Sequence, residues 1–249
     1  MTTFPGTSGR AGRPARFLLT WALVLFLGMV LFQFLHECGH GFGSQLDGLH
    51  VSTGFNRVGD AGKFPKDADF RSEQIETGFL GSGGLLGPFV NWMLAIFFTA
   101  WLLQRTRPGR ATLFFGVGAV ANALMRLPAM SLFFLGALLG RVHFEDEVDW
   151  GLGAVRGLHL PMPFADVRAL AKARPGLFLA EPRLYFWPLL SFGISVLCFV
   201  LAQRRLRRIF AAECPSKLSR WAFWLMPVAV IPPMFLLCSW LDNVIRINW

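Results

Sequence analysis

Five long apolar runs constrain this chain more than any other feature of its sequence. They lie at about residues 17–40, 78–103, 111–139, 185–203 and 221–241. As a helix, each run is long enough to cross the hydrocarbon layer of a bilayer, which is about 30 Å thick. Backbone N–H and C=O groups find no water in that layer, so each run must satisfy its hydrogen bonds internally. The runs therefore predict a polytopic membrane protein of the all-α class with about five transmembrane helices.

Composition supports a membrane location and argues against nucleic-acid binding. The chain is 54% hydrophobic with a mean hydropathy of +0.48, which is too apolar for an ordinary soluble domain of 249 residues. Its net charge is +9, but the basic residues fall in short clusters between the apolar runs rather than on one polar surface. We expect an integral, multi-pass protein of a bacterial cytoplasmic membrane, with the lipid bilayer as a partner and no nucleic acid.

The charges between the apolar runs predict an orientation. One set of segments holds 12 Lys and Arg but one acid: residues 1–16, 104–110 and 204–220. The other set holds 11 Lys and Arg and 13 acids: residues 41–77, 140–184 and 242–249. With five spans the two sets fall on opposite sides of the membrane. Because basic loops stay in the cytoplasm, the N-terminus is predicted to be cytoplasmic and the C-terminus external.

A metal-binding pattern lies at the end of the first apolar run, where residues 36–40 read His-Glu-Cys-Gly-His. Residues four apart share one face of a helix, so His36 and His40 can reach a single Zn²⁺. Glu37 then points toward the open coordination position and can act as a base. Ionisable side chains at membrane depth are costly and usually functional. The alternative is a structural pair of histidines, hydrogen-bonded at the water interface.

A second polar feature lies in the next apolar run, where Gly87-Pro88-Phe89-Val90-Asn91 follows a glycine-rich segment at 81–84. Pro88 frees a backbone carbonyl, and Asn91 places an amide inside an apolar helix. Glycines here, like Gly39 and Gly41 in the first run, allow another backbone to approach closely. The alternative interpretation is a kinked packing helix without a functional role.

Together, these two segments resemble the site-2 protease family of intramembrane zinc metalloproteases. The resemblance covers roughly residues 20–150, and the spacing suits a compact member without an inserted PDZ domain. The weak alternation of side chains from Leu49 to Phe55 indicates a short strand or hairpin, and it is similar to the membrane-associated β-hairpin of that family. The expected fold is thus all-α with a short β-hairpin after the first helix.

The resemblance implies a role for each matching residue. His36 and His40 would ligate one Zn²⁺, and Glu37 would be the general base in a peptide-bond hydrolysis. Asn91 would bind the substrate strand or the developing oxyanion. The substrate would be a membrane protein or peptide. The family's catalytic centre usually lies nearer the cytosolic side, whereas the charge pattern places residue 40 at the outer end of the first span.

The third zinc ligand departs from the family pattern, in which an aspartate follows as part of an Asn-Pro…Leu-Asp-Gly segment. Asn122 and Pro128 are present, but no Asp-Gly follows within that run. The closest approximation is Asp149, within Val148-Asp-Trp-Gly151, and Asp146 is the second choice. A solvated acidic loop is the alternative interpretation of this cluster.

Three other ionisable residues bear on the site. Arg126 follows Asn122 by one helical turn, and a buried arginine needs a carboxylate or carbonyl partner. We expect it to pair with the acidic stretch 145–149, either to orient a ligand or as a purely structural ion pair. His143 and Asp242 are more remote ligand candidates, because neither has metal-site spacing to the two histidines.

The chain divides into four predicted parts. These are a basic N-terminal tail at 1–16, a protease-like core at 17–150, an extramembrane loop at 151–184 and two C-terminal transmembrane helices at 185–249. A helical pattern is expected at 166–173 within the loop.

Three functions fit these observations. The first is a zinc metalloendopeptidase of the site-2 protease type. The second is a non-catalytic scaffold or regulator with the same architecture, which the displaced third ligand favours. The third is a transporter that uses His36, Glu37 and Arg126 as a polar relay, and the absence of inverted repeats in the sequence argues against it.

Overall fold

The computed structural model describes residues 12–56, 58–60, 82–159 and 164–249, and most of these are helical. Its long helices are α1 (Gly12–Leu46), α3 (Ser82–Leu103), α4 (Arg110–Leu138), α8 (Phe186–Ile209), α9 (Lys217–Ala229) and α10 (Ile231–Leu241). Five stretches are long and apolar enough to cross a membrane: 14–46, 84–103, 110–138, 182–209 and 217–241. This architecture fits a multi-pass membrane protein, as the five apolar runs predicted.

The fifth stretch is two helices rather than the single one predicted. Helix α9 ends at Ala229 and α10 begins at Ile231. Pro232 and Pro233 follow at once, and their missing N–H groups cannot bond to the carbonyls one turn earlier. The helix is therefore interrupted between Ala229 and Ile231. By contrast, α4 continues through Pro128.

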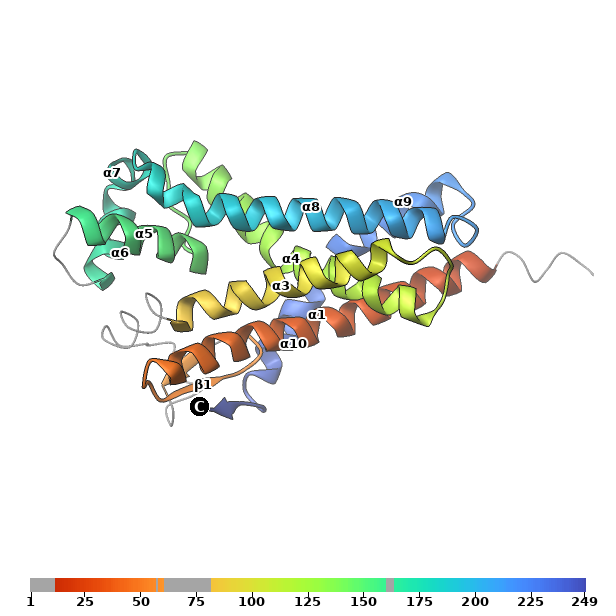
Figure 1. Cartoon of the computed structure of the whole chain (residues 1–249), viewed down its shortest axis with the longest axis horizontal. Helices are drawn as coiled ribbons and strands as arrows, with labels where there is room; N and C mark the ends of the chain where they lie inside the picture. Colours follow the sequence, from red (N-terminus) through yellow and green to blue (C-terminus); the bar gives the residue numbers. More distant parts are fainter. Residues whose placement is uncertain (1–11, 57, 61–81, 160–163) are drawn as a thin grey trace, which may run out of the picture.

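The long helices run along a common axis and alternate in direction (Figure 1). The 104–109 connection and the α8–α9 connection lie at one end of the molecule. The β-strands, α5, α6 and α7 lie at the other end. Among the described residues, the basic segments and the mixed-charge segments thus lie at opposite ends, as the charge pattern predicted.

Helix α4 is the central helix of the bundle. It packs against α1, α3 and α8. In its most apolar stretch, 67% of the residues are buried, a larger share than in any other candidate span. Small residues permit this: a Cβ on Gly118 would lie 2.4 Å from the Phe98 ring, and one on Gly116 would lie 2.6 Å from Leu206. Polar side chains on α4 therefore face protein rather than lipid.

A three-stranded antiparallel sheet follows α1, in the order β2–β1–β3. The hairpin pairs β1 (Val51–Thr53) with β2 (Val58–Asp60), in the register Val51 opposite Asp60. This confirms the predicted hairpin. The third strand, β3 (Ile247–Asn248), comes from the C-terminal segment and was not predicted.

The C-terminal residue ties the sheet to α1. The Trp249 backbone N–H donates to the carbonyl of Val51 at 2.9 Å, and its indole Nε1 donates to Thr53 Oγ1 at 2.8 Å. A Cβ on Gly41 would lie 2.1 Å from the Trp249 indole nitrogen. The absence of a side chain at Gly41 thus lets the indole pack directly on α1.

A cluster of short helices covers the end of the bundle that carries the mixed charges. It comprises α5 (Asp146–His159), α6 (Phe164–Ala173), α7 (Pro175–Leu179) and the 3-10 turn η2 (Pro182–Tyr185). Phe133 of α4 packs with Val148, Leu152 and Phe178 in its core. Helix α6 confirms the helical pattern expected at 166–173.

The acidic stretch is not a solvated loop, so that interpretation is wrong. Asp146, Glu147 and Asp149 form the first turn of α5, and Glu147 and Asp149 are only 2% and 4% exposed. Acidic side chains in a first turn are stabilised by the helix dipole and by the N–H groups that lack intrahelical partners. The sequence pattern alone did not indicate that α5 packs against the bundle and buries these residues.

Candidate metal centre

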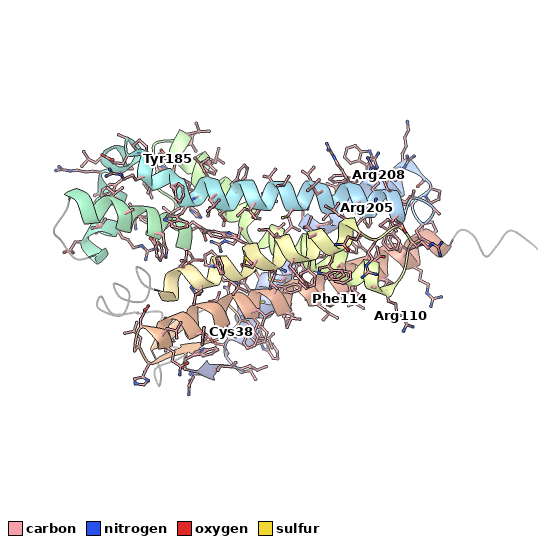
Figure 2. All side chains as sticks on the ribbon, viewed as in Figure 1. Cys38, Arg110, Phe114, Tyr185, Arg205 and Arg208 are labelled. Carbon is pink, nitrogen blue, oxygen red and sulfur yellow. The ribbon has the colours of Figure 1, made fainter. Side chains whose placement is uncertain are left out.

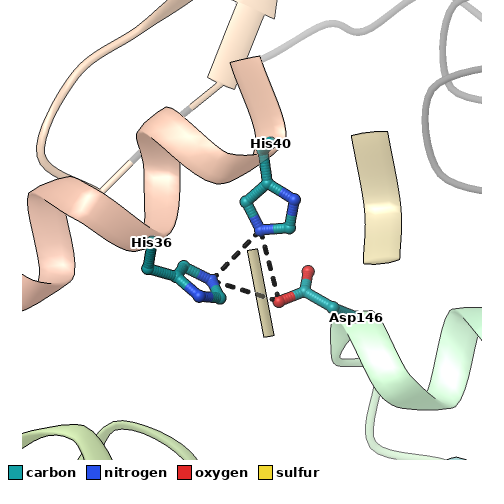
Figure 3. Close-up of side chains that lie close together, drawn as sticks. All are labelled: His36, His40 and Asp146. Carbon is teal, nitrogen blue, oxygen red and sulfur yellow. Dashed lines mark hydrogen bonds and ion pairs between the residues drawn. The ribbon is translucent and has the colours of Figure 1, made fainter. Parts of the chain in front are cut away.

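His36 and His40 project from one face of α1, as their spacing predicted (Figure 3). Both are buried, with 4% and 5% of their surface exposed. Their Nε2 atoms lie 3.1 Å apart, and the two rings stand nearly perpendicular at 87°. One turn of helix has therefore brought two imidazole nitrogens to a common point.

Asp146, the first residue of α5, supplies a third atom at the same point. Its Oδ2 lies 3.3 Å from His36 Nε2 and 3.5 Å from His40 Nε2. Figure 3 shows the three side chains pointing toward one another from α1 and α5. Two histidines and an aspartate thus form a group that can hold a metal ion.

The spacing of these atoms suits a tetrahedral metal. Ligand atoms about 2.0–2.1 Å from a tetrahedral zinc are about 3.3 Å from one another. The observed separations of 3.1, 3.3 and 3.5 Å bracket that value. Three lone-pair donors that converge in a buried site also need a cation between them, whether a proton or a metal. The residues therefore fit a metal ion.

The other ligand candidates lie elsewhere. Asp149 Oδ1 is 3.2 Å from Arg168 Nε of α6, and His143 Nε2 is 3.3 Å from Glu145 Oε1 on the partly exposed approach to α5. Asp242 accepts backbone N–H groups from the β1–β2 turn. The structure places Asp146, the second choice from the sequence, beside the histidines. Asp149 lies three residues further along α5, about 4.5 Å along its axis.

Glu37 is buried within the same site, at 7% exposure. Gln33, one turn earlier on α1, donates from Nε2 to Glu37 Oε1 at 3.0 Å. The sequence analysis did not identify Gln33, although its position four residues before Glu37 is a usable signal. A cavity of about 440 Å³ is lined by Gln33, Glu37, both histidines and Asp146. The candidate base therefore faces the same space as the metal-binding group.

Arg126 of α4 borders the metal-binding group. Its Nη2 lies 3.3 Å from Asp146 Oδ2. The Arg126 guanidinium also forms a bidentate ion pair with Glu147, in which Nε donates to Oε1 at 2.8 Å. This confirms that Arg126 pairs with the acidic stretch. Both partners are buried, so the pair is held in a defined geometry rather than solvated.

A chain of hydrogen bonds extends from this ion pair toward α8 and α3. Ser191 of α8 donates from Oγ to Glu147 Oε1 at 2.6 Å, and Trp92 of α3 donates from Nε1 to Ser191 Oγ at 3.0 Å. The sequence analysis identified neither residue, because only the tertiary fold brings them to α5. Glu147 is thus held directly by Arg126 of α4 and Ser191 of α8, and Trp92 of α3 supports Ser191.

The acidic residues at the start of α5 differ in their ionisation. Burial works to raise the pKa of Asp146, but His40, His36 and Arg126 together hold that pKa well below its usual range. Burial raises the pKa of Glu145, which Arg126 offsets only in part. Burial raises the pKa of Asp149 to about 7, despite Arg168. The neighbouring His40, His36 and Arg126 side chains therefore favour the ionised form of the Asp146 carboxylate.

Close contact between α1 and α3 forms the wall beside His40. A Cβ on Gly87 would lie 2.3 Å from His40 Nε2, and one on Gly39 would lie 2.7 Å from the carbonyl oxygen of Leu86. This confirms that the glycines of both runs allow a close backbone approach. Any side chain at position 87 would push the His40 ring out of the group.

Asn91 lies one turn beyond Gly87, fully buried between α3 and α4. Its Nδ2 donates to Asn122 Oδ1 at 3.0 Å, and Asn122 Nδ2 donates to the carbonyl of Gly118 at 2.8 Å. Asn91 Oδ1 has no donor in the described part of the chain. The structure thus shows an inter-helix contact for Asn91, and its role toward a substrate stays a prediction.

The described part of the structure is mostly helical, with five helical stretches long and apolar enough to cross a membrane. It also contains a His-His-Asp group, with both histidines buried, that could hold a metal ion. No protein-family model, curated protein or solved structure matches this chain.

Proposed function

We propose that this protein is a membrane-embedded zinc metalloendopeptidase of the site-2 protease type. One observation carries the proposal: Glu37 lies in the same buried cavity as the converging side chains of His36, His40 and Asp146. Two imidazoles and one carboxylate are a typical ligand set for a catalytic zinc, and they leave a fourth position for water or substrate. When bound, the metal supplies a Lewis acid that polarises a carbonyl and makes a water molecule more acidic.

Glu37 carries the proton transfers in this proposal. Gln33 donates to Oε1, which helps to fix the carboxylate, and Oε2 is the proton acceptor in this proposal. Glu37 takes a proton from the attacking water and passes it to the nitrogen of the departing amine. One residue thus serves as base and then as acid. Its burial excludes competing solvent and strengthens its interactions with charged groups.

The surroundings of the cavity suit a substrate that comes from the bilayer. Besides the polar groups, the cavity is lined by apolar side chains of α1, α4 and α10, including Met29, Leu124 and Phe235. Helical backbone carbonyls are already hydrogen-bonded within the helix. A transmembrane substrate must therefore unwind locally before its peptide bond reaches Glu37.

The decisive experiment compares cleavage with metal content. Purified protein in detergent is mixed with a transmembrane reporter peptide, with and without a chelator. The Glu37→Gln variant should keep about one zinc per chain and lose cleavage by about 10²-fold or more. Glu213→Gln is the matched control, because it makes the same chemical change at the opposite end of the molecule. Cleavage by Glu37→Gln at the wild-type rate would refute the proposal.

A non-catalytic metal-binding scaffold is the second candidate, and one observation favours it. Asp146 Oδ2 is 3.3 Å from the Arg126 guanidinium as well as from His36. A carboxylate shared with a buried cation donates less charge to a metal. Near-stoichiometric zinc that is lost in His36→Ala, together with no cleavage of any reporter by the wild type, would support the scaffold instead.

A further inference from the structure

A second candidate site lies at the opposite end of the bundle, where α8 meets α9. A cavity of about 640 Å³ is lined by Arg207, Lys217, Arg220, Trp221 and Trp224. An adjoining cavity of about 420 Å³ shares Arg207 and Arg220 with it and adds Arg208. Arg207 of α8 and Arg220 of α9 therefore line both cavities, together with Lys217 in the first and Arg208 in the second.

These cations have no acidic partners in the part of the chain that the structure describes. No carboxylate lies within ion-pairing distance of Arg207, Lys217 or Arg220 among the residues that the structure describes. Arg220 Nε donates to the carbonyl of Ser216 at 3.3 Å, which orients the guanidinium, and its other N–H groups have no partner among the described residues. The nearby acid, Glu213, lines neither cavity. The site therefore carries an uncompensated positive charge that an anion would neutralise.

The larger cavity also has an apolar wall. Trp221 is 66% exposed, and the Trp224 ring packs edge-on against Phe199 of α8, with centroids 6.4 Å apart. Tryptophan is favoured where a bilayer meets water, because its ring is apolar while its N–H is polar. Cations beside an exposed indole and a half-buried one match a ligand with an anionic head and an apolar body.

The position of the cavity along the bundle supports the same class of ligand. It lies where one candidate span ends at Ile209 and the next begins at Lys217. Arg110, Arg205 and Arg208 lie at this same end (Figure 2). This is the end that the charge pattern assigns to the cytoplasmic face, whose lipids include anionic headgroups.

We propose that the α8–α9 cavity binds one anionic phospholipid. Arg207 and Arg220 bind its phosphate through paired N–H donors, as guanidinium groups do with phosphate oxygens. The acyl chains lie along Trp221 and Trp224. Free phosphate shares the headgroup chemistry, but it would leave the indole wall uncovered. This site does not depend on the proposed protease activity, because it lies at the other end of the bundle from the metal-binding group.

Native mass spectrometry of the full chain in detergent tests this proposal. The protein is titrated with dioleoyl phosphatidylglycerol, and in parallel with dioleoyl phosphatidylcholine, which has the same chains and no net charge. We expect one saturable phosphatidylglycerol adduct per chain. The double variant Arg207→Gln with Arg220→Gln should weaken its binding about tenfold or more, since each basic residue near an anionic surface contributes a several-fold factor.

The control variant removes two charges from the same end without altering the cavity. Arg110→Gln with Arg204→Gln should bind phosphatidylglycerol like the wild type, because neither residue lines the cavity. Equal loss in both double variants would overturn the proposal in favour of a general charge effect. Equal binding of phosphatidylcholine would overturn it as well.

Two further measurements cover the remaining outcomes. Displacement of phosphatidylglycerol by millimolar inorganic phosphate would show that the site binds free phosphate rather than lipid, and would overturn the proposal. If the arginine double variant does not remain monodisperse, Trp224→Leu is tested instead. Loss of the adduct in that variant supports the lipid site, and an unchanged adduct refutes the proposed acyl-chain contact.

Discussion

The Arg126 guanidinium lies 3.3 Å from the Asp146 carboxylate, so a buried cation borders the metal-binding group. The same arginine is held in place by Glu147, which Ser191 contacts in turn. Outer partners of this kind orient a metal ligand, and their loss typically costs 10- to 100-fold in metal affinity. Arg126 is thus a positioning residue for Asp146 in the candidate metal-binding group.

Replacing Arg126 by lysine should weaken zinc binding by about tenfold. Lysine keeps the charge but lacks the planar fork that binds Glu147 at two points, so Asp146 loses its fixed neighbour. A chelator-competition titration of the purified protein measures the change. Arg168→Lys is the control, because Arg168 pairs with Asp149 outside the metal-binding group. An unchanged zinc affinity with a lowered unfolding temperature would mean that the Arg126–Glu147 pair is purely structural.

Replacing Gly87 by alanine should reduce zinc occupancy sharply. The added methyl group would lie 2.3 Å from His40 Nε2, so the ring must turn away from Asp146. Overpacking of this kind costs about 1–3 kcal/mol. Zinc content of the purified variant, measured by mass spectrometry of the metal, reports the effect. Gly193→Ala on α8 is the matched control, since nothing lies within 4 Å of its added Cβ. Full zinc occupancy in Gly87→Ala would contradict the observed packing of α3 on α1.

Replacing Asp242 by alanine should loosen the β1–β2 turn beside the metal site. Asp242 Oδ1 accepts the backbone N–H groups of Phe55 at 2.5 Å and of Asn56 at 3.0 Å. Hydrogen bonds to a charged group contribute about 1.5–3 kcal/mol each, so amide exchange in this turn should accelerate by tenfold or more. Hydrogen–deuterium exchange of peptides that span residues 51–56 measures this.

Asn243→Ala serves as the control for the Asp242 variant. Its side chain is exposed and donates to the carbonyl of Ser239, away from the sheet. Equal exchange rates in the two variants would show that Asp242 does not hold the turn.

Replacing Asp149 by asparagine should stabilise the protein at high pH. Burial raises the pKa of this carboxyl to about 7, against about 3.9 in an unfolded chain. The folded state therefore binds its proton more tightly, and wild-type stability falls as the pH rises from about 4 to about 7. The variant has no carboxyl group to titrate, so it does not lose this stability as the pH rises. The loss in the wild type is at most about 4 kcal/mol, because the pKa is raised by about three units.

Thermal unfolding in detergent at pH 4.5, 6 and 8 tests the Asp149 prediction. The difference between variant and wild type should be small at pH 4.5, should grow through pH 6 and should level off above pH 7. A constant difference across the three pH values would show that Asp149 does not titrate in this range.

Local sequence patterns were enough to predict the structure wherever a single helix or turn sets the geometry. The apolar runs predicted the long helices, because backbone groups in hydrocarbon have no other way to be satisfied. The four-residue spacing of His36 and His40 predicted that they share a face, because the period of the α-helix fixes it. The glycines at 39 and 87 likewise predicted a close helix contact, which the structure confirms.

Tertiary structure alone decided which carboxylate joins the histidines. Asp146 and Asp149 lie one turn apart on α5, and a short-range pattern favoured Asp149. The choice depends on how α5 packs against α3 and α8, which brings Asp146 to His36 although the two residues are 110 positions apart in the sequence. The same packing brings Ser191 to Glu147 and β3 to β1. Such contacts are set by the burial and pairing of side chains far apart in the sequence, and no local period encodes them.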